Sequence, residues 1–205
     1  ILNIVFIICC LPIVTIGASL TALHYVTLKM VRNEESYIVK SFFKSFKQNF
    51  KQATIINLIM LLFGGILYLD LNIINNMSGS MASVLHVLFI AFGIVYFVIF
   101  LYLYPVLAKF YNTIKHTFRN AFLMSIRHLP YTVLMALITA APVAIFFIPT
   151  AQVQSIVLLL FILMGFSLEA FINGHFLVKI FDNYIIETPS KTSDTEESSE
   201  QTPAV

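Results

Sequence analysis

Charged side chains are scarce in this chain of 205 residues, and the scarcity excludes a soluble fold. Only 11% of the residues are charged, whereas 59% are hydrophobic. Soluble domains carry about 25% charged residues, so this chain has too few to cover a surface exposed to water. Apart from Asp70 and Glu169, the charges lie in three stretches, 29–51, 109–127 and 179–200. Apolar runs of about 20 residues, the length that crosses a bilayer, separate these stretches and predict a multi-pass membrane protein.

Motifs that would indicate an enzyme or a cofactor are absent. The sequence contains neither the glycine-rich loops that hold nucleotides nor the GxSxG and HExxH motifs of hydrolases. Its cysteines, Cys9 and Cys10, are adjacent in an apolar run, and no cysteine or histidine spacing suits a metal. The net charge of +2 comes from bases at the ends of apolar runs and does not indicate nucleic-acid binding. We therefore expect no enzymatic activity, no cofactor, no metal site and no nucleic-acid partner.

The stretch 38–53, IVKSFFKSFKQNFKQA, has the pattern of a basic amphipathic helix. At about 100° per residue, its apolar side chains share one face and its lysines form an adjoining stripe. We expect this helix to lie along the anionic inner leaflet of a lipid bilayer, with lysines near phosphates and phenylalanines near acyl chains or neighbouring helices. Docking of a partner protein is the other open interpretation of this surface. Under either interpretation the docking residues are Lys40, Phe42, Phe43, Lys44, Phe46, Lys47, Phe50 and Lys51.

The distribution of basic residues predicts which ends of the spans face the cytoplasm. Bases concentrate in 29–52 and 108–130, and the positive-inside rule places both stretches, together with the C-terminus, in the cytoplasm. The second stretch is expected to hold another amphipathic surface helix. The predicted fold is an all-α, multi-pass transmembrane helical bundle with two cytoplasmic amphipathic surface helices and about five spans, at 1–28, 53–69, 81–107, 131–148 and 153–178.

The predicted spans belong to one helical domain, 1–187, which a polar and acidic stretch follows at 188–205. This stretch has no apolar spacing and is predicted to be a disordered cytoplasmic tail. The chain opens at Ile1 with neither a methionine nor a basic n-region. We therefore expect that it does not start with a signal peptide and that a segment upstream of Ile1 is missing.

Prolines and small residues lie inside the predicted spans. Pro12 is expected to kink the first span, and Pro105 to break or bend the third. Small residues four positions apart let another helix approach closely. The residues expected to determine how the first span packs are Pro12, Gly17, Ala18, Thr21 and Ala22.

Glu169 lies inside the apolar run of the last predicted span, and Asn173 follows on the same helical face. A carboxyl group in a membrane is costly and is expected to face protein or water. One interpretation is a polar cavity in which both residues contact a proton or a substrate. The other interpretation is structural, with Glu169 protonated or satisfied by hydrogen bonds between helices.

Three segments resemble a known family: LPIVTIGASLTAL at 11–23 with the nearby Tyr25, SFFKSFKQNFKQA at 41–53, and INGHFLVKIFDNYI at 172–185. With the acidic stretch excepted, the chain is similar to the YesL-like family, also called domain of unknown function 624. Members are small bacterial integral membrane proteins, so the resemblance implies a location in the bacterial cell membrane. Glu169 departs from the family's closing pattern, which has an apolar residue there.

The resemblance also implies a role near sugar uptake, because members tend to be encoded beside carbohydrate transporters. It supplies no catalytic residues. The first hypothesis for function is therefore an accessory protein that binds the subunits of a carbohydrate ABC transporter. The alternative comes from the residues themselves and is a small permease with an intramembrane site near Glu169 and Asn173.

Overall fold

A computed structural model describes residues 1–34, 37–77, 79–145 and 150–185, and these residues form helices and turns without a strand. The predicted all-α fold is confirmed. The acidic stretch 188–205 and residues 146–148 of the predicted fourth span lie outside the described residues. In chain order the elements are α1 (Leu2–Cys10), the 3-10 turn η1 (Ile13–Thr15), α2 (Ile16–Val31), α3 (Ile38–Asn75), α4 (Ser80–Lys109), α5 (Ile114–Arg127), α6 (Leu129–Ile145), α7 (Ala151–Leu160), the π turn η2 (Phe161–Gly165) and α8 (Phe166–Asp182).

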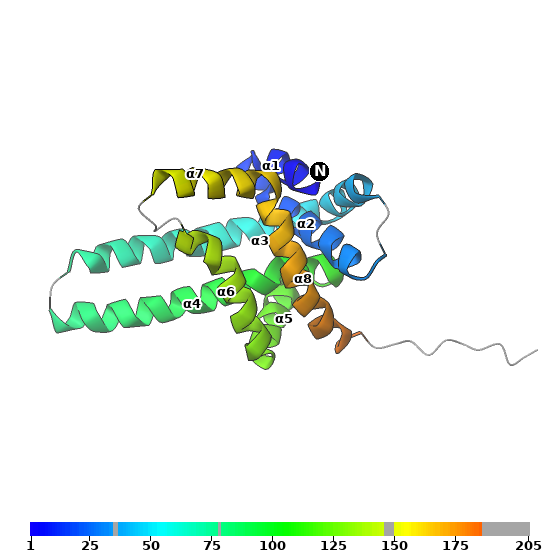
Figure 1. The fold of residues 1–205 in the computed structure, drawn as a ribbon. Coiled ribbons are helices and arrows are strands. Elements are labelled where there is room, and N and C mark those ends of the chain that lie inside the picture. The colour runs from blue at the N-terminus through cyan, green and yellow to red at the C-terminus, as the bar shows by residue number, and fades with distance from the viewer. Residues whose placement is uncertain (35–36, 78, 146–149, 186–205) are drawn as a thin grey trace, which may run out of the picture.

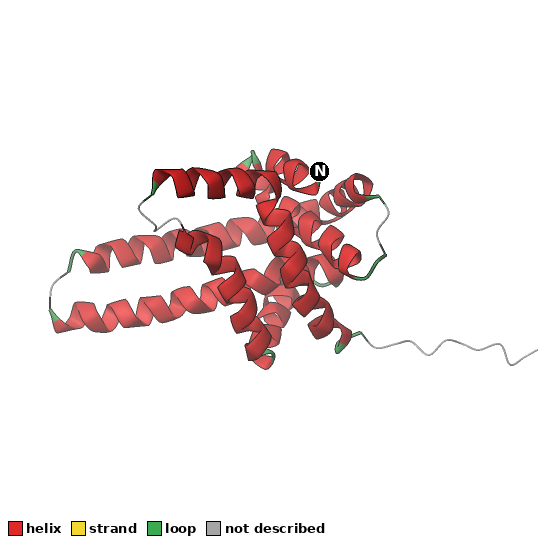
Figure 2. Cartoon of the chain, in the orientation of Figure 1, coloured by secondary structure: helices red, strands yellow, loops and turns green. Residues whose placement is uncertain are grey.

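Two long helices, α3 and α4, form an antiparallel hairpin whose tip extends beyond the other helices (Figure 1). Helices make up nearly all of the described chain (Figure 2). The 38 residues of α3 span about 57 Å, well beyond the ~30 Å hydrocarbon core of a bilayer. Within the described residues, 4 stretches are long and apolar enough to cross a membrane, and the bent pair α5 and α6 would make a fifth. The chain is therefore a multi-pass membrane protein, and these stretches are Ile13–Val31, Ile38–Asn75, Ser80–Lys109 and Gln152–Asp182.

Two helices continue where the sequence predicts a boundary. α3 runs without interruption across Ala53, so the predicted surface helix and the second span are one helix. The break predicted at Pro105 is absent, because α4 continues through this residue to Lys109. All side chains from Tyr102 to Leu107 are buried, and their packing holds the helix together despite the hydrogen bond that proline cannot donate.

The interruption predicted near Pro12 is present, since α1 ends at Cys10 and a 3-10 turn precedes α2. Backbone carbonyl groups freed by such a break need partners inside the protein when the helix lies in lipid. The Thr15 hydroxyl donates to the carbonyl oxygen of Cys9 at 2.6 Å. Asn57 of α3 donates its side-chain amide to the carbonyl oxygen of Ile13 at 3.3 Å. The break is therefore supported both locally and by a neighbouring helix.

A second interruption lies between α7 and α8, where the π turn η2 marks a pronounced bend of the chain (Figure 1). Asn3 of α1 is buried against this turn. Its amide nitrogen donates to the carbonyl oxygens of Phe161 at 3.0 Å and Ile162 at 2.7 Å. Its carbonyl oxygen accepts from the backbone N–H of Ser167 at 2.9 Å. One side chain therefore bonds two carbonyl groups of the turn and one N–H group of α8, and joins both elements to α1.

The third interruption is the corner between α5 and α6, whose axes are bent by 102°. The hydroxyl oxygen of Thr132 lies 2.7 Å from the carbonyl oxygen of Ser125 and 3.1 Å from that of His128. The Tyr102 hydroxyl of α4 lies 2.8 Å from the same Thr132 oxygen. This buried polar group therefore links the corner to α4.

The small-residue face of α2 lies against α3. A Cβ atom added at Gly17 would lie 2.5 Å from the carbonyl oxygen of Ala53, so the two backbones are in direct contact at this point. Pro12, in contrast, is exposed at the helix break. It shapes the turn before α2 but is not part of the packed face. The predicted packing residues that the structure buries are Gly17, Ala18, Thr21 and Ala22.

Replacing Asn3 by leucine is expected to destabilise the bundle, because leucine cannot bond the π turn. The change leaves backbone groups of η2 and α8 without partners, and we expect a loss of about 2–4 kcal/mol in the free energy of unfolding. Denaturant unfolding of the purified protein in detergent measures this loss. Asn72→Leu is the matched control, since the exposed Asn72 side chain donates to the Tyr68 carbonyl of its own helix. Equal losses in both variants would contradict the role assigned to Asn3.

Candidate functional site

A cavity of about 540 Å3 lies between α1, α2, α4, α6, η2 and α8. Its volume falls within the roughly 300–1,000 Å3 of small-molecule sites. Most of the wall is apolar and includes the aromatic rings of Phe6, Phe100, Phe161 and Phe166. The polar side chains of the wall, apart from the thiol of Cys10, are His24, Thr139, Glu169 and Asn173. The cavity is therefore an apolar chamber with a few polar groups, which is the usual composition of a ligand site.

Three of these polar side chains form a connected chain between α6 and α8. Glu169 and Asn173 are one helical turn apart on α8, and Thr139 of α6 contacts both. The Asn173 amide nitrogen donates to the Thr139 hydroxyl oxygen at 3.1 Å. The Thr139 side chain also interacts with the carboxyl group of Glu169. The costly carboxyl group thus has a protein partner, and Thr139 holds it beside Asn173.

Two buried atoms of the cavity wall have no hydrogen-bond partner in the described part of the chain. They are the side-chain oxygen Oδ1 of Asn173 and the ring nitrogen Nδ1 of His24. A buried polar atom without a partner costs about 1–3 kcal/mol, so native proteins contain few of them. Both residues line the same cavity, so its wall contains polar atoms whose hydrogen bonds the described chain does not satisfy.

The polar groups of the wall favour a ligand that donates hydrogen bonds. The Asn173 oxygen only accepts, a carboxylate at Glu169 would also only accept, and the His24 nitrogen donates or accepts according to its tautomer. A small apolar molecule that carries an amine or a hydroxyl group matches this set. In the residues that the structure describes, no three histidine, cysteine or carboxylate side chains gather as they would around a metal ion.

The structure places both predicted site residues, Glu169 and Asn173, on the cavity wall. Sequence reasoning missed Thr139 and did not connect His24 with the site. Thr139 is an isolated polar residue in the apolar segment ALITAAPVA at 136–144, whereas His24 lies among other polar residues in TALHYVTLK at 21–29. The isolation of Thr139 was a usable signal, but no spacing along the chain relates residues on three different helices.

Packing buries part of the predicted docking surface of α3 and leaves the rest exposed. Phe42 is 0% exposed in a cluster with side chains of α1, α2 and α8, so its assignment to lipid or partner docking is corrected. The reason is that the N-terminal part of α3 packs against the bundle. Phe46 is partly buried beside it, whereas Phe43 and Phe50 are exposed. The lysines of the predicted surface are all exposed, and they are Lys40, Lys44, Lys47 and Lys51.

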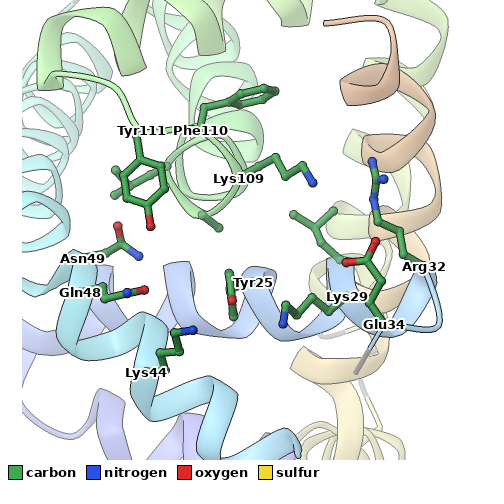
Figure 3. Close-up of a pocket in the computed structure, with 13 residues that line it drawn as sticks. Tyr25, Lys29, Arg32, Glu34, Lys44, Gln48, Asn49, Lys109, Phe110 and Tyr111 are labelled. Atoms are coloured by element: carbon green, nitrogen blue, oxygen red, sulfur yellow. The ribbon is translucent and has the colours of Figure 1, made fainter. Parts of the chain in front are cut away.

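A second pocket, of about 250 Å3, lies where the C-terminal ends of α2 and α4 meet the N-terminal part of α3. Lys44 of α3, Lys109 of α4 and Lys29 of α2 surround it, with Glu34 at one side (Figure 3). We call it the basic pocket. Of the four lysines in the predicted stripe on α3, Lys44 alone lines this pocket.

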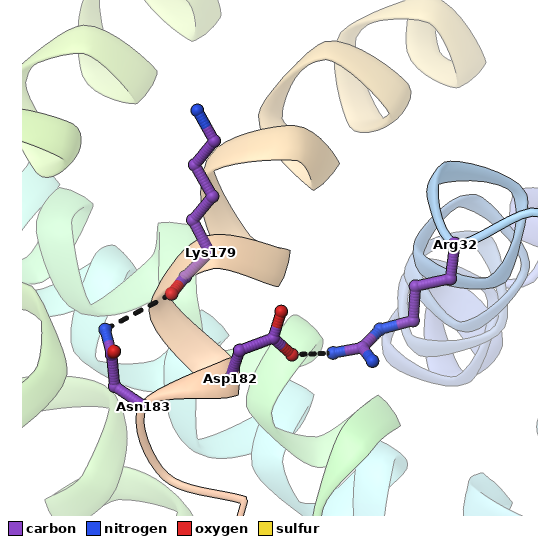
Figure 4. A network of polar contacts seen from close by, with 4 residues as sticks. All are labelled: Arg32, Lys179, Asp182 and Asn183. Atoms are coloured by element: carbon purple, nitrogen blue, oxygen red, sulfur yellow. Dashed lines mark hydrogen bonds and ion pairs between the residues drawn. The ribbon is translucent and has the colours of Figure 1, made fainter.

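An ion pair joins Arg32, the residue that follows α2, to Asp182, the last residue of α8. The guanidinium group of Arg32 contacts the carboxylate of Asp182 (Figure 4). The residue after Asp182 is Asn183, whose side-chain amide donates to the carbonyl oxygen of Lys179 at 3.2 Å. The contact brings the predicted first and last spans together at the end of the bundle that carries the basic pocket.

Comparison with known proteins gives a family match at the N-terminal end. Residues 1–71 match DUF624, which is described as a protein of unknown function. The predicted family resemblance is confirmed. The uncharacterized protein YteU of Bacillus subtilis (strain 168) is 27% identical over 128 residues, which are 62% of this chain and 56% of YteU. The match therefore spans just over half of that relative's length. No solved structure matches the chain.

The DUF624 match covers α1, η1, α2 and most of α3. It therefore includes the Pro12 break, the contact at Gly17 and His24 of the cavity wall. The remaining polar residues of the cavity, Glu169 among them, lie beyond residue 71. The DUF624 segment supplies one side of the cavity, and α6 and α8 supply the other.

Proposed function

We propose that this chain is a small permease that binds an amphipathic solute in the cavity around Glu169. The observation that supports this function most is the group of unpartnered and bridging polar atoms in an otherwise apolar cavity. Helices long enough to cross a membrane form most of the wall of that cavity. Transporter sites are commonly built in this way, where interrupted helices meet near the middle of a bundle.

The solute proposed is an apolar molecule with one amine or hydroxyl group. An amine would donate to the carboxyl group of Glu169 and to Asn173 Oδ1, while its hydrocarbon part would contact the phenylalanine rings. A sugar fits less well, because its many hydroxyl groups would face more apolar wall than polar partners. The proposed function consists of binding the solute and letting it pass. It involves no catalysis and requires no cofactor.

We further propose that the protein lies in the bacterial cell membrane with its C-terminus in the cytoplasm. Basic side chains from α2, α3 and α4 gather at one end of the bundle, in the basic pocket. Lys179 lies in the last turn of α8, whose end the ion pair of Asp182 joins to α2. One basic end supports an orientation with that end in the cytoplasm.

Binding can be measured with a tryptophan reporter, because the chain contains no tryptophan of its own. In Phe100→Trp, the single indole would line the cavity and its fluorescence would change when octylamine binds. Adding Glu169→Gln is expected to weaken octylamine binding by at least about tenfold, because a charge-assisted hydrogen bond is lost. Glu34→Gln is the matched control, since Glu34 lies outside this cavity.

Transport is then tested with the same variants in proteoliposomes that contain octylamine. Faster amine release from vesicles with the native chain than from vesicles with Glu169→Gln would support the permease. Binding that Glu169→Leu leaves unchanged would overturn the site. Binding without release would restrict the function to solute binding.

A second candidate function is an accessory protein of a carbohydrate ABC transporter. The exposed Phe43 and Phe50 beside exposed lysines on α3 support it, because the chain's own helices do not cover them. The family resemblance provides the class of partner. The alternative to partner docking is that the same side chains attach α3 to an anionic inner leaflet.

Co-purification from the native membrane in mild detergent tests the accessory role. Recovery of carbohydrate-transporter subunits in near-equal amounts is expected, and Phe43→Ala with Phe50→Ala should reduce it by about tenfold. Phe92→Ala is the matched control, because Phe92 is exposed on α4 away from this surface. Purification of the chain alone would exclude a stable complex, and equal loss with the control would exclude docking through α3.

A further inference from the structure

The basic pocket concentrates positive charge from three elements that are far apart in the sequence. Lys29 and Arg32 come from the end of α2, Lys44 from α3 and Lys109 from the end of α4. The ammonium groups of the three lysines point toward a common space (Figure 3). Among the described residues, Glu34 is the acidic residue of the pocket wall. The arrangement gathers four cations around one carboxylate.

Ion pairs within the chain compensate only part of this charge. Arg32 is paired with Asp182 of α8 (Figure 4). The ammonium nitrogen of Lys29 lies over the Tyr25 ring, 5.1 Å from its centre. Among the described residues, neither Lys44 nor Lys109 forms an ion pair with a carboxylate. The pocket therefore has positive charge available for an anion.

Helix dipoles explain the positions of two of the pocket lysines but not the position of the third. Lys29 and Lys109 lie in the last turns of α2 and α4, where a cation complements the partial negative charge of about −0.5 at a helix end. Lys44 lies near the beginning of α3 and faces no end of its own helix. The favourable interaction of a cation with a helix end therefore does not account for Lys44, which lines the same pocket as Lys109.

We propose that the basic pocket binds a phosphate group, carried either by a phospholipid head group or by a soluble phosphorylated molecule. Lysines bind phosphate as point charges, and the Tyr25 and Tyr111 hydroxyls and the Gln48 amide on the wall can donate further hydrogen bonds. At about 250 Å3 the pocket is smaller than drug-sized sites of roughly 300–1,000 Å3, so it suits a head group rather than a large ligand. It shares no wall residue with the Glu169 cavity, and the proposal is independent of the permease function.

The test uses the purified chain in detergent, with phosphatidylglycerol as the probe and native mass spectrometry to count bound lipids. One saturable lipid is expected. Lys44→Gln and Lys109→Gln should each weaken its binding about tenfold, because each removes a full charge next to the phosphate. Lys47→Gln is the matched control on the same helix, exposed and outside the pocket, and should change binding by about twofold or less.

A second arm distinguishes the two sources of phosphate. Glycerol 3-phosphate that displaces the lipid and binds alone, in a manner sensitive to Lys44→Gln, would identify a soluble ligand. Lipid binding that glycerol 3-phosphate does not displace would identify the membrane as the source. Lys44→Arg should retain binding, which separates loss of charge from loss of fold. Equal weakening by Lys44→Gln and Lys47→Gln, or no saturable binding of either probe, would overturn the proposal.

Discussion

In a membrane every backbone N–H and C=O group needs a partner within the protein, and this constraint shapes the whole bundle. The described chain has three helix interruptions, and at each of them a polar side chain forms hydrogen bonds with the backbone. Asn57 bonds the turn after Pro12, Asn3 bonds the π turn at Ile162, and Thr132 bonds the corner between α5 and α6. The first two contacts join segments distant in sequence, and Tyr102 of α4 extends the third, so the hydrogen bonds that allow the interruptions also fix the arrangement of the helices.

The interruptions in turn shape the proposed solute cavity. The π turn brings Phe161 to the cavity wall, and Glu169 follows it on α8. Asn3 satisfies backbone groups of this turn, whereas the oxygen of Asn173, a residue of the cavity wall, has no hydrogen-bond partner in the described chain. Stabilising the backbone and binding a solute are thus assigned to different polar residues. We therefore expect a change at Asn3 to act on folding, and under the proposed function a change at Glu169 acts on binding.

Much of the fold could be predicted from composition and local pattern. Segregated charges predicted a multi-pass helical protein, because a bilayer selects apolar runs whatever packs against them. The break at Pro12 was also predictable, since proline acts on its own helix. Of the break or bend predicted at Pro105 the break is absent, because buried neighbours hold the helix together, and the boundary placed at Ala53 does not interrupt α3. In both places packing decides whether a helix continues, and packing is not a local property.

The candidate sites divide in the same way. The sequence by itself determined the helical membrane class and the pairing of Glu169 with Asn173, because spacing along one helix depends on local geometry alone. Only the tertiary structure decided that Thr139 bridges that pair and that Lys44 meets Lys109 in the basic pocket. Such contacts depend on how each helix is rotated and crossed against its neighbours. These quantities are set by the packing of all the side chains together, and no spacing within one segment contains them.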